Sequence, residues 1–190
     1  NLVPDSLTMS AGSSMNISGG TLNINPGNAW NNLGNLSLSA GTLNLYNTFT
    51  LANLGSYTRT AGSILALRGT LDLQNSGTAL DIGSAGQLGA GGLGTLYGAI
   101  KNGTIVSTDA TPTLSISGAL DNIAIGSNLT VTGSFNIYNG LTLADGITIN
   151  KGGNDWYFNG YDNGGKPAGT VHHLATLGSS VINSTGGNLY

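Results

Sequence analysis

Hydrophobic and polar residues alternate along most of this chain, in short segments separated by breaks that contain glycine. A period of two is typical of β-strands that bury one face, and no window of the sequence shows the stripe of an amphipathic helix. The apolar–polar–apolar triplet occurs at residues 22–24, 36–38, 43–45, 71–73, 80–82, 114–116, 123–125, 129–131, 135–137, 141–143 and 147–149. The pattern therefore predicts an all-β protein.

A longer repeat of 21 residues lies on top of the short alternation. Segments 18–24, 39–45 and 60–66 align at this spacing, although Arg59 breaks the apolar pattern at a position expected to face inward. Further along the chain the local motif persists but the spacing loosens, as expected of loops of unequal length on a regular core. The same residue types return one repeat later, which predicts a parallel β-helix, or β-solenoid, with coils of about 21 residues. About nine such coils, spaced like neighbouring strands, would form a rod about 40 Å long.

The pattern of hydrophobic and polar residues changes near residue 153. Residues 1–153 carry the regular pattern of β-solenoid coils, whereas residues 154–190 begin with an aromatic and glycine-rich stretch and resume the pattern only weakly. We expect both parts to belong to one domain, with 154–190 forming a strand, a protruding loop and final, less regular coils.

The amino-acid composition excludes several classes of protein and of binding partner. Charged residues make up only 7% of the chain and the net charge is −3, so a row of phosphates or an anionic membrane surface is not an expected partner. The 32 glycines show no three-residue period and there are only 4 prolines, which excludes collagen. No cysteine is present, which excludes disulfides and thiolate metal sites. We expect no cofactor.

Three stretches resemble a known group of proteins: residues 54–62, 94–105 and 120–131. They are similar to the repeats of large secreted bacterial β-helix proteins, which include the passenger regions of autotransporter and filamentous-haemagglutinin-like adhesins. The resemblance covers most of residues 10–150. It implies a right-handed β-helix in an extracellular or cell-surface setting, and it carries over no catalytic residues. The sequence shows no signal peptide, so the targeting segment of an exported protein would have been removed or would lie outside this chain.

One aromatic segment is a candidate contact site for carbohydrate or another partner. Its residues are Asp155, Trp156, Tyr157, Tyr161 and Asp162. Aromatic faces stack on sugar rings, and carboxylates accept hydrogen bonds from hydroxyl groups. The alternative, which we favour, is an aromatic plug or capping loop.

Other candidate chemistry is sparse. Asp72 and Asp81, with Arg68 nearby in sequence, could serve a polysaccharide lyase or hydrolase, but aspartates between aliphatic residues are also typical of a solvated strand face. His172 and His173 are adjacent, so on a strand they point to opposite faces and cannot readily chelate one metal ion. We therefore do not expect an enzyme.

A stack of hydroxyl residues at the 21-residue spacing raises the possibility of ice binding. Thr21, Thr42 and Ser63 form this stack, but the second threonine rank that ice binding needs is missing, because Asn23 and Asn44 stand there. Stacked asparagines are better explained as a hydrogen-bonded ladder along the solenoid.

The function expected from the sequence is an extracellular structural or adhesive β-solenoid module, part of a cell-surface adhesin, a biofilm-matrix protein or a self-assembling filament. The alternative is a carbohydrate-binding or carbohydrate-active β-helix that uses the loop at 154–167. The expected partner is a second copy, joined end to end, or further coils of a longer chain, with cell-surface or matrix polysaccharide as another candidate. We expect no nucleic acid and no membrane insertion.

Overall fold

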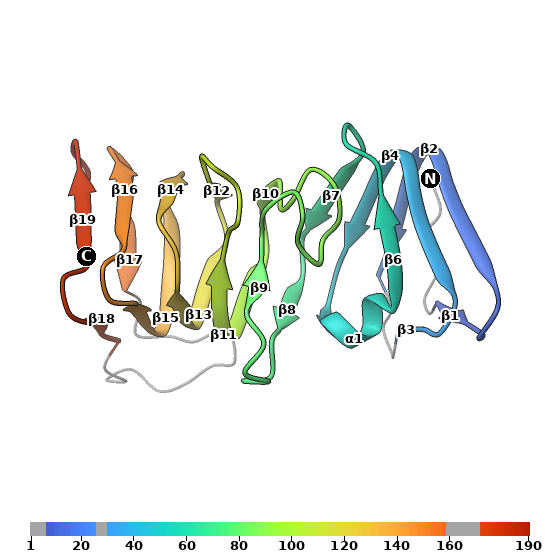
Figure 1. Ribbon diagram of the computed structural model, residues 1–190, viewed down its shortest axis with the longest axis horizontal. Helices are drawn as coiled ribbons and strands as arrows, with labels where there is room; N and C mark the ends of the chain where they lie inside the picture. Colours follow the sequence, from blue (N-terminus) through green and yellow to red (C-terminus); the bar gives the residue numbers. More distant parts are fainter. Residues whose placement is uncertain (1–6, 26–29, 159–171) are drawn as a thin grey trace.

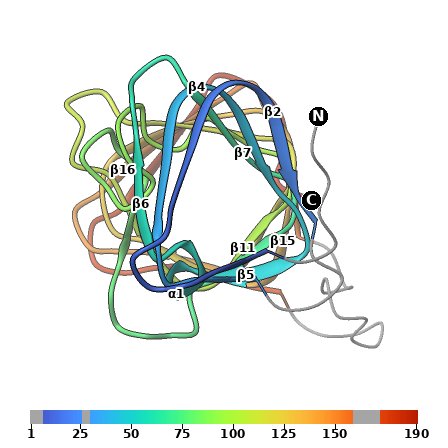
Figure 2. The same ribbon diagram turned by 90° about the vertical axis from the view of Figure 1, so that its right-hand side faces the viewer.

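The computed structural model describes residues 7–25, 30–158 and 172–190. Its strands run across the long axis and stack along it as a β-solenoid of about seven coils of roughly 21 residues (Figure 1). Seen from the N-terminal end, the chain passes clockwise through β5, α1 and β6 as it recedes, so the solenoid is right-handed (Figure 2). The predicted fold class is confirmed.

Two sheets build the walls of the rod, and every strand pairing in them is parallel. Sheet 1 contains β2 (Ser14–Ile24), β4 (Asn35–Leu45), β6 (Ser56–Arg59), β7 (Ile64–Leu67), β10 (Thr95–Leu96), β12 (Thr113–Ile116), β14 (Leu129–Thr132), β16 (Thr148–Gly152) and β19 (Val181–Ser184). Sheet 2 contains β5 (Thr48–Thr50), β8 (Thr70–Asp72), β9 (Leu80–Asp81), β11 (Ala99–Val106), β13 (Ala119–Ile125), β15 (Phe135–Leu143), β17 (Trp156–Phe158) and β18 (Leu174–Thr176). A short pair, β1 (Thr8–Met9) with β3 (Asn31–Asn32), and the single-turn helix α1 (Leu51–Leu54) complete the described elements.

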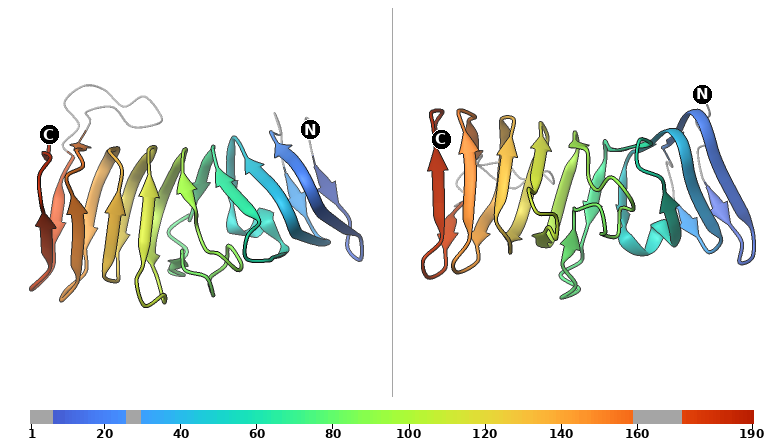
Figure 3. Two further views of the ribbon diagram at one scale, coloured as in Figure 1. Left: turned by 90° about the horizontal axis from the view of Figure 1, so that it is seen from above. Right: turned by 45° about the horizontal axis from the view of Figure 1, so that its top comes forward.

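The core is a set of aliphatic rows that run along the inside of the rod. Leu71, Ile100, Leu120 and Ile137 are register partners on successive strands of sheet 2, and all four are fully buried. Each row exists because alternate residues of a strand point to one face, so stacked coils place like residues above one another. Figure 3 shows this stacking along the length of the rod.

The 21-residue alignment holds for two coils and shifts by one residue in the third. Leu43 pairs with Leu22 as predicted, but its partner on the other side is Leu65, not Ile64. The turn between β6 and β7 contains one residue more than the alignment assumed, and a one-residue slip exchanges the two faces of a strand. Ile64 therefore points outward with 57% of its surface exposed, and it replaces Ser63 in the stack of Thr21 and Thr42.

Two coils are much longer than 21 residues, and together they account for about one of the two coils by which the rod falls short of the nine expected. Leu96 is the register partner of Leu67, 29 positions earlier (96 − 67), because the turns at residues 82–94 are inserted in this coil. Asn183 stacks on Asn150 across 33 positions. The first insertion also explains why the chain has an arginine at position 59, where the pattern predicts an inward apolar residue. Arg59 Nε donates a hydrogen bond to the carbonyl of Ala90, in the inserted turns, at 2.6 Å.

The predicted asparagine ladder is confirmed, and a second ladder accompanies it. Asn44 Nδ2 donates to Asn23 Oδ1 at 2.6 Å. In sheet 2, Asn102, Asn122 and Asn139 stack at a bend with φ values of 59°, 54° and 55°. Asparagine tolerates this left-handed conformation better than other non-glycine residues. Its amide at the same time links the bends of neighbouring coils, as between Asn122 and Asn102.

The two ends of the rod differ in how well they cover the core. At the N-terminal end, Ile17, Leu22 and Ile24 of β2 are buried. At the C-terminal end, Ile182 stacks on the fully buried Ile149 and yet is only half-buried, and Leu174 is also half-buried. The last described coil therefore leaves its inward side partly open to solvent.

Candidate functional site

A groove follows the corner at which sheet 1 turns into sheet 2, and glycines create it. Gly69, Gly98 and Gly118 occupy the same place in three successive coils, and a Cβ atom on any of them would lie well under 3.0 Å from a backbone oxygen of the preceding coil. Only glycine allows the backbones to approach this closely. The corner therefore lacks side chains at these positions, and a hollow results.

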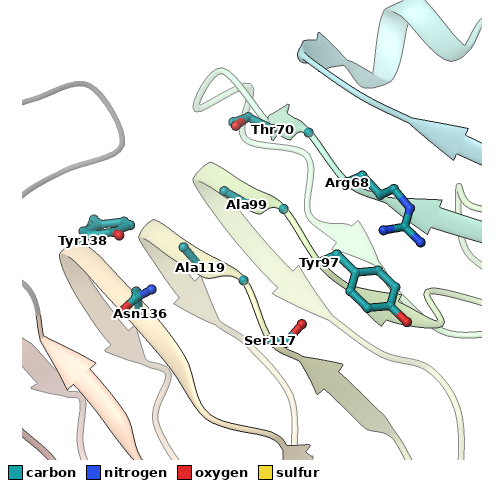
Figure 4. Close-up of a pocket in the computed structure, with 11 residues that line it drawn as sticks. Arg68, Thr70, Tyr97, Ala99, Ser117, Ala119, Asn136 and Tyr138 are labelled. Atoms are coloured by element: carbon teal, nitrogen blue, oxygen red, sulfur yellow. The ribbon is translucent and has the colours of Figure 1, made fainter. Parts of the chain in front are cut away.

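The groove has a volume of about 370 Å³ and crosses four coils (Figure 4). Its floor is a row of register partners with small or short side chains: Thr70, Ala99, Ala119 and Asn136. The volume lies within the range typical of small-ligand sites, which is roughly 300–1,000 Å³. The groove is open along the rod, so it suits an elongated molecule.

An arginine and a tyrosine form the rim on the side of sheet 1. The guanidinium of Arg68 lies 4.7 Å from the ring centroid of Tyr97, and its Nε donates to Asn44 Oδ1 at 3.1 Å. The cation–π contact and the hydrogen bond hold both side chains in place. Tyr97 nevertheless keeps 48% of its surface exposed at the groove.

A charged row lies two residues further along sheet 2, outside the floor. Asp72, Lys101, Asp121 and Tyr138 are register partners, and Tyr138 lines the far end of the groove. Lys101 Nζ lies 3.4 Å from Asp72 Oδ2, and Asn139 Nδ2 donates to Asp121 Oδ1 at 2.5 Å. Opposite charges thus alternate along this row.

The carboxyl group of Asp72 is held in its ionised form. Burial raises its pKa, but hydrogen bonds from the backbone N–H of Gln74 and from the amide of Asn102 lower it. The neighbouring ammonium of Lys101 lowers it further, and the resulting pKa lies below the usual range. The folded protein therefore binds this proton less tightly than the unfolded chain does.

We expect acid to destabilise the fold partly through Asp72. A depressed pKa in the folded state gives stability that is complete above the unfolded pKa of about 3.9 and is lost as pH falls through the folded value. Asp72→Asn should therefore lose less unfolding free energy than the wild type between pH 6 and pH 2, as measured by urea unfolding. Asp81 and Asp145, whose pKa values are also lowered, keep the variant partly acid-sensitive. Identical pH profiles for variant and wild type would contradict this prediction.

The aromatic segment predicted as a contact site is used largely for packing. Trp156 is fully buried, and its ring centroid lies 5.2 Å from that of Phe135. Tyr157 stacks on Tyr190 at 5.1 Å with nearly parallel rings, and its hydroxyl donates to Asp155 Oδ2 at 3.3 Å. The ring of Trp156 is thus unavailable to a sugar. Tyr161 and Asp162 lie outside the described residues.

The remaining candidates do not form a common centre. Asp81 accepts a hydrogen bond from Thr108 Oγ1 at 2.7 Å and fixes a turn, whereas Asp72 pairs with Lys101. His172 Nδ1 accepts the backbone N–H of Asn139 at 2.7 Å. Among the residues that the structure describes, no group of three or more histidine or acidic side chains gathers where it could hold a metal ion.

A buried lysine stabilises the last coil, and the sequence analysis did not identify it. Lys151 is fully buried, and its Nζ donates to the carbonyls of Asn154 and Gly186 and to Ser184 Oγ. These three oxygens compensate for the loss of water around the ammonium group. Lys151 therefore joins β16 to the turns that follow β16 and β19.

Comparison of this chain with protein-family models, curated proteins and solved structures gives no match. Across the described residues, no helix is long and apolar enough to cross a membrane. The geometry of the rod and its groove therefore carries the functional argument.

The groove has a sequence signal that the analysis of motifs did not use. Residues 69–71, 98–100 and 118–120 read glycine, then threonine or alanine, then a buried aliphatic residue. The triplet begins at the corner in these three coils, and it also occurs outside the groove at residues 41–43 and 94–96. Its spacing is unequal, because the loops between the corners differ in length, so the alignment across coils becomes clear only in the structure.

Proposed function

We propose that this chain is an extracellular structural and adhesive β-solenoid module whose rod is extended by end-to-end joining to a second copy. The observation that carries the proposal is the open C-terminal end. Ile182 and Leu174 continue the inward rows of the fully buried Ile149 and Leu141 there, and both are only half-buried. Apolar side chains that continue an internal core row are stabilised when a further coil covers them.

The strand edges at the two ends support the same proposal. Within the described ranges, β19 pairs only with β16, and β2 pairs only with β4, so each leaves one edge without a strand. Unpaired edges present rows of N–H and C=O groups that bind another strand. A contact between opposite ends does not close on itself, and it therefore produces a filament. The net charge of −3 on 190 residues opposes such association only weakly.

The assembly can be tested with a charge at the open end. We expect the purified chain to form rods longer than one copy at high concentration, seen by electron microscopy and light scattering. Ile182→Lys places an ammonium group on the inward side of the open end, where it must be desolvated in a joint, and should weaken association about tenfold or more.

Ile64→Lys is the control, because Ile64 is 57% exposed and points outward from the flank of the rod. It should leave association unchanged. A wild-type chain that stays monomeric at high concentration, or equal effects of the two lysines, would refute the joint at β19.

A second candidate function, carbohydrate binding, is supported by the groove between Tyr97 and Tyr138. It concerns the flank of the rod and does not depend on the joint at its end.

A further inference from the structure

We propose that the corner groove binds an uncharged polysaccharide chain that crosses the groove obliquely. The site differs from the aromatic segment at 155–162 that the sequence singled out, since it is built from the corners of four coils in the middle of the molecule. It would supply the module with its adhesive contact.

The shape of the groove fits an extended chain. Its floor passes through four register partners, from Thr70 to Asn136, and three steps between neighbouring strands span about 14 Å. The buried residues Ala99 and Ala119 keep the middle of this floor low, and Gly98 and Gly118 beside them add no side chain. A short oligosaccharide segment can lie in this space without displacing any part of the fold.

Two tyrosines are placed to stack on sugar rings. Tyr97 lines the groove on its sheet 1 side, and Tyr138 lines it on its sheet 2 side two coils further on, so the two residues lie diagonally across the groove (Figure 4). Two coil steps correspond to about 10 Å along the axis, and the four strand positions between the two residues add up to about 13 Å across it. A tyrosine ring presents an apolar face to the C–H groups of a sugar and a hydroxyl group to its polar edge. The contact between Tyr97 and Arg68 fixes the first ring before a ligand arrives, which lowers the entropy lost on binding.

A hydroxyl group between the two rings supplies hydrogen bonds. The exposed Ser117 lies at the sheet 1 side of the groove. Its hydroxyl group both donates and accepts, which suits the hydroxyl groups of a sugar. Sites for small molecules commonly combine an open hydrophobic surface with a few such groups.

The charges around the groove favour a neutral ligand. Arg68 and Lys101 are balanced by Asp72 and Asp121, so the two cations and two anions cancel formally. Lys101 is paired directly with Asp72. An acidic polymer is attracted by an excess of cations along its path, and this groove has none.

The test uses the full chain in affinity gel electrophoresis with soluble polysaccharides. The neutral probes are galactomannan, mixed-linkage β-glucan and dextran, and the acidic probes are alginate and polygalacturonate. We expect at least one neutral probe to retard the protein. The double variant Tyr97→Ala/Tyr138→Ala should bind that probe about tenfold more weakly or worse. Ser117→Arg, which fills the groove and leaves both tyrosines in place, should weaken binding to a similar degree.

Tyr157→Ala is the control, because this tyrosine belongs to the aromatic segment near the end of the rod. It should leave retardation unchanged, and thermal unfolding should show that every variant is folded. Retardation by none of the neutral probes, retardation that survives both groove variants, or loss with Tyr157→Ala alone would overturn the proposal. Each outcome is independent of filament formation, which the lysine at position 182 tests separately.

Discussion

Replacing Gly118 by alanine is expected to destabilise the middle of the rod by about 3 kcal/mol or more. The added Cβ would lie well under 3.0 Å from the carbonyl oxygen of Gly98, which belongs to the preceding coil. Neither atom can rotate away, since both are fixed to hydrogen-bonded backbone, and the N–H of Ala119 donates to that same carbonyl. The two coils must therefore separate locally, which weakens the ladder between β11 and β13. Denaturant unfolding followed by circular dichroism measures the loss.

Gly19→Ala is the matched control for this change. Gly19 lies in β2, a Cβ added to it would have no heavy atom within 4 Å, and its φ is not left-handed. Its unfolding free energy should change by no more than about 0.5 kcal/mol, as for other surface substitutions. A loss at Gly118 as small as that at Gly19 would show that the corner can relax, and the close approach of the coils would then not require glycine.

Leu43→Ala should cost about 2–5 kcal/mol, because it removes a fully buried side chain from the centre of an aliphatic row. Leu43 lies between Leu22 and Leu65, which cannot both move into the cavity without breaking their own strands. Thr42→Ala, one residue away on the outward face, should cost well under that amount. Unfolding in urea compares the two variants directly.

The same measurement tests the register of the third coil. Leu65→Ala should resemble Leu43→Ala, and Ile64→Ala should resemble Thr42→Ala, since Leu65 is buried and Ile64 is exposed. Equal costs at Leu43 and Thr42 would contradict the assignment of inward and outward faces. A larger cost at Ile64 than at Leu65 would favour the simple 21-residue alignment over the observed pairing.

The fold was predictable because one short rule repeats many times. Alternation places the aliphatic residue of each triplet inside, and a recurring coil length separates a solenoid from a sandwich. The number of coils was less predictable, since it depends on the insertion at 82–94 and on the long final coil. The shift at Ile64 was not predictable either, because a single extra residue in a turn leaves the local alternation intact.

The groove could not be predicted in the same way. It depends on three glycines that are distant in sequence and neighbours in space, and the triplets that they begin also occur outside the groove, at residues 41–43 and 94–96. Conversely, the aromatic composition around Trp156 suggested a surface site, and the structure buries that ring against Phe135. An aromatic side chain is stable either in the core or at a surface binding site. Its neighbours in the adjacent coils, which the sequence does not reveal, determine which of the two it occupies.

The short sequence separation between most register partners has a consequence for how this protein loses its structure. Most neighbouring coils contact one another across about 20 residues, as between Asn102 and Asn122 or between Ser37 and Asn16. Each coil therefore depends on its two neighbours and hardly on coils further away, which makes the molecule a one-dimensional array. Mechanical force or proteolysis at one end is therefore expected to unfold the coils one after another, starting from that end. The buried Lys151 donates hydrogen bonds from the last coil but one to the last coil, so it slows the first of these unfolding steps.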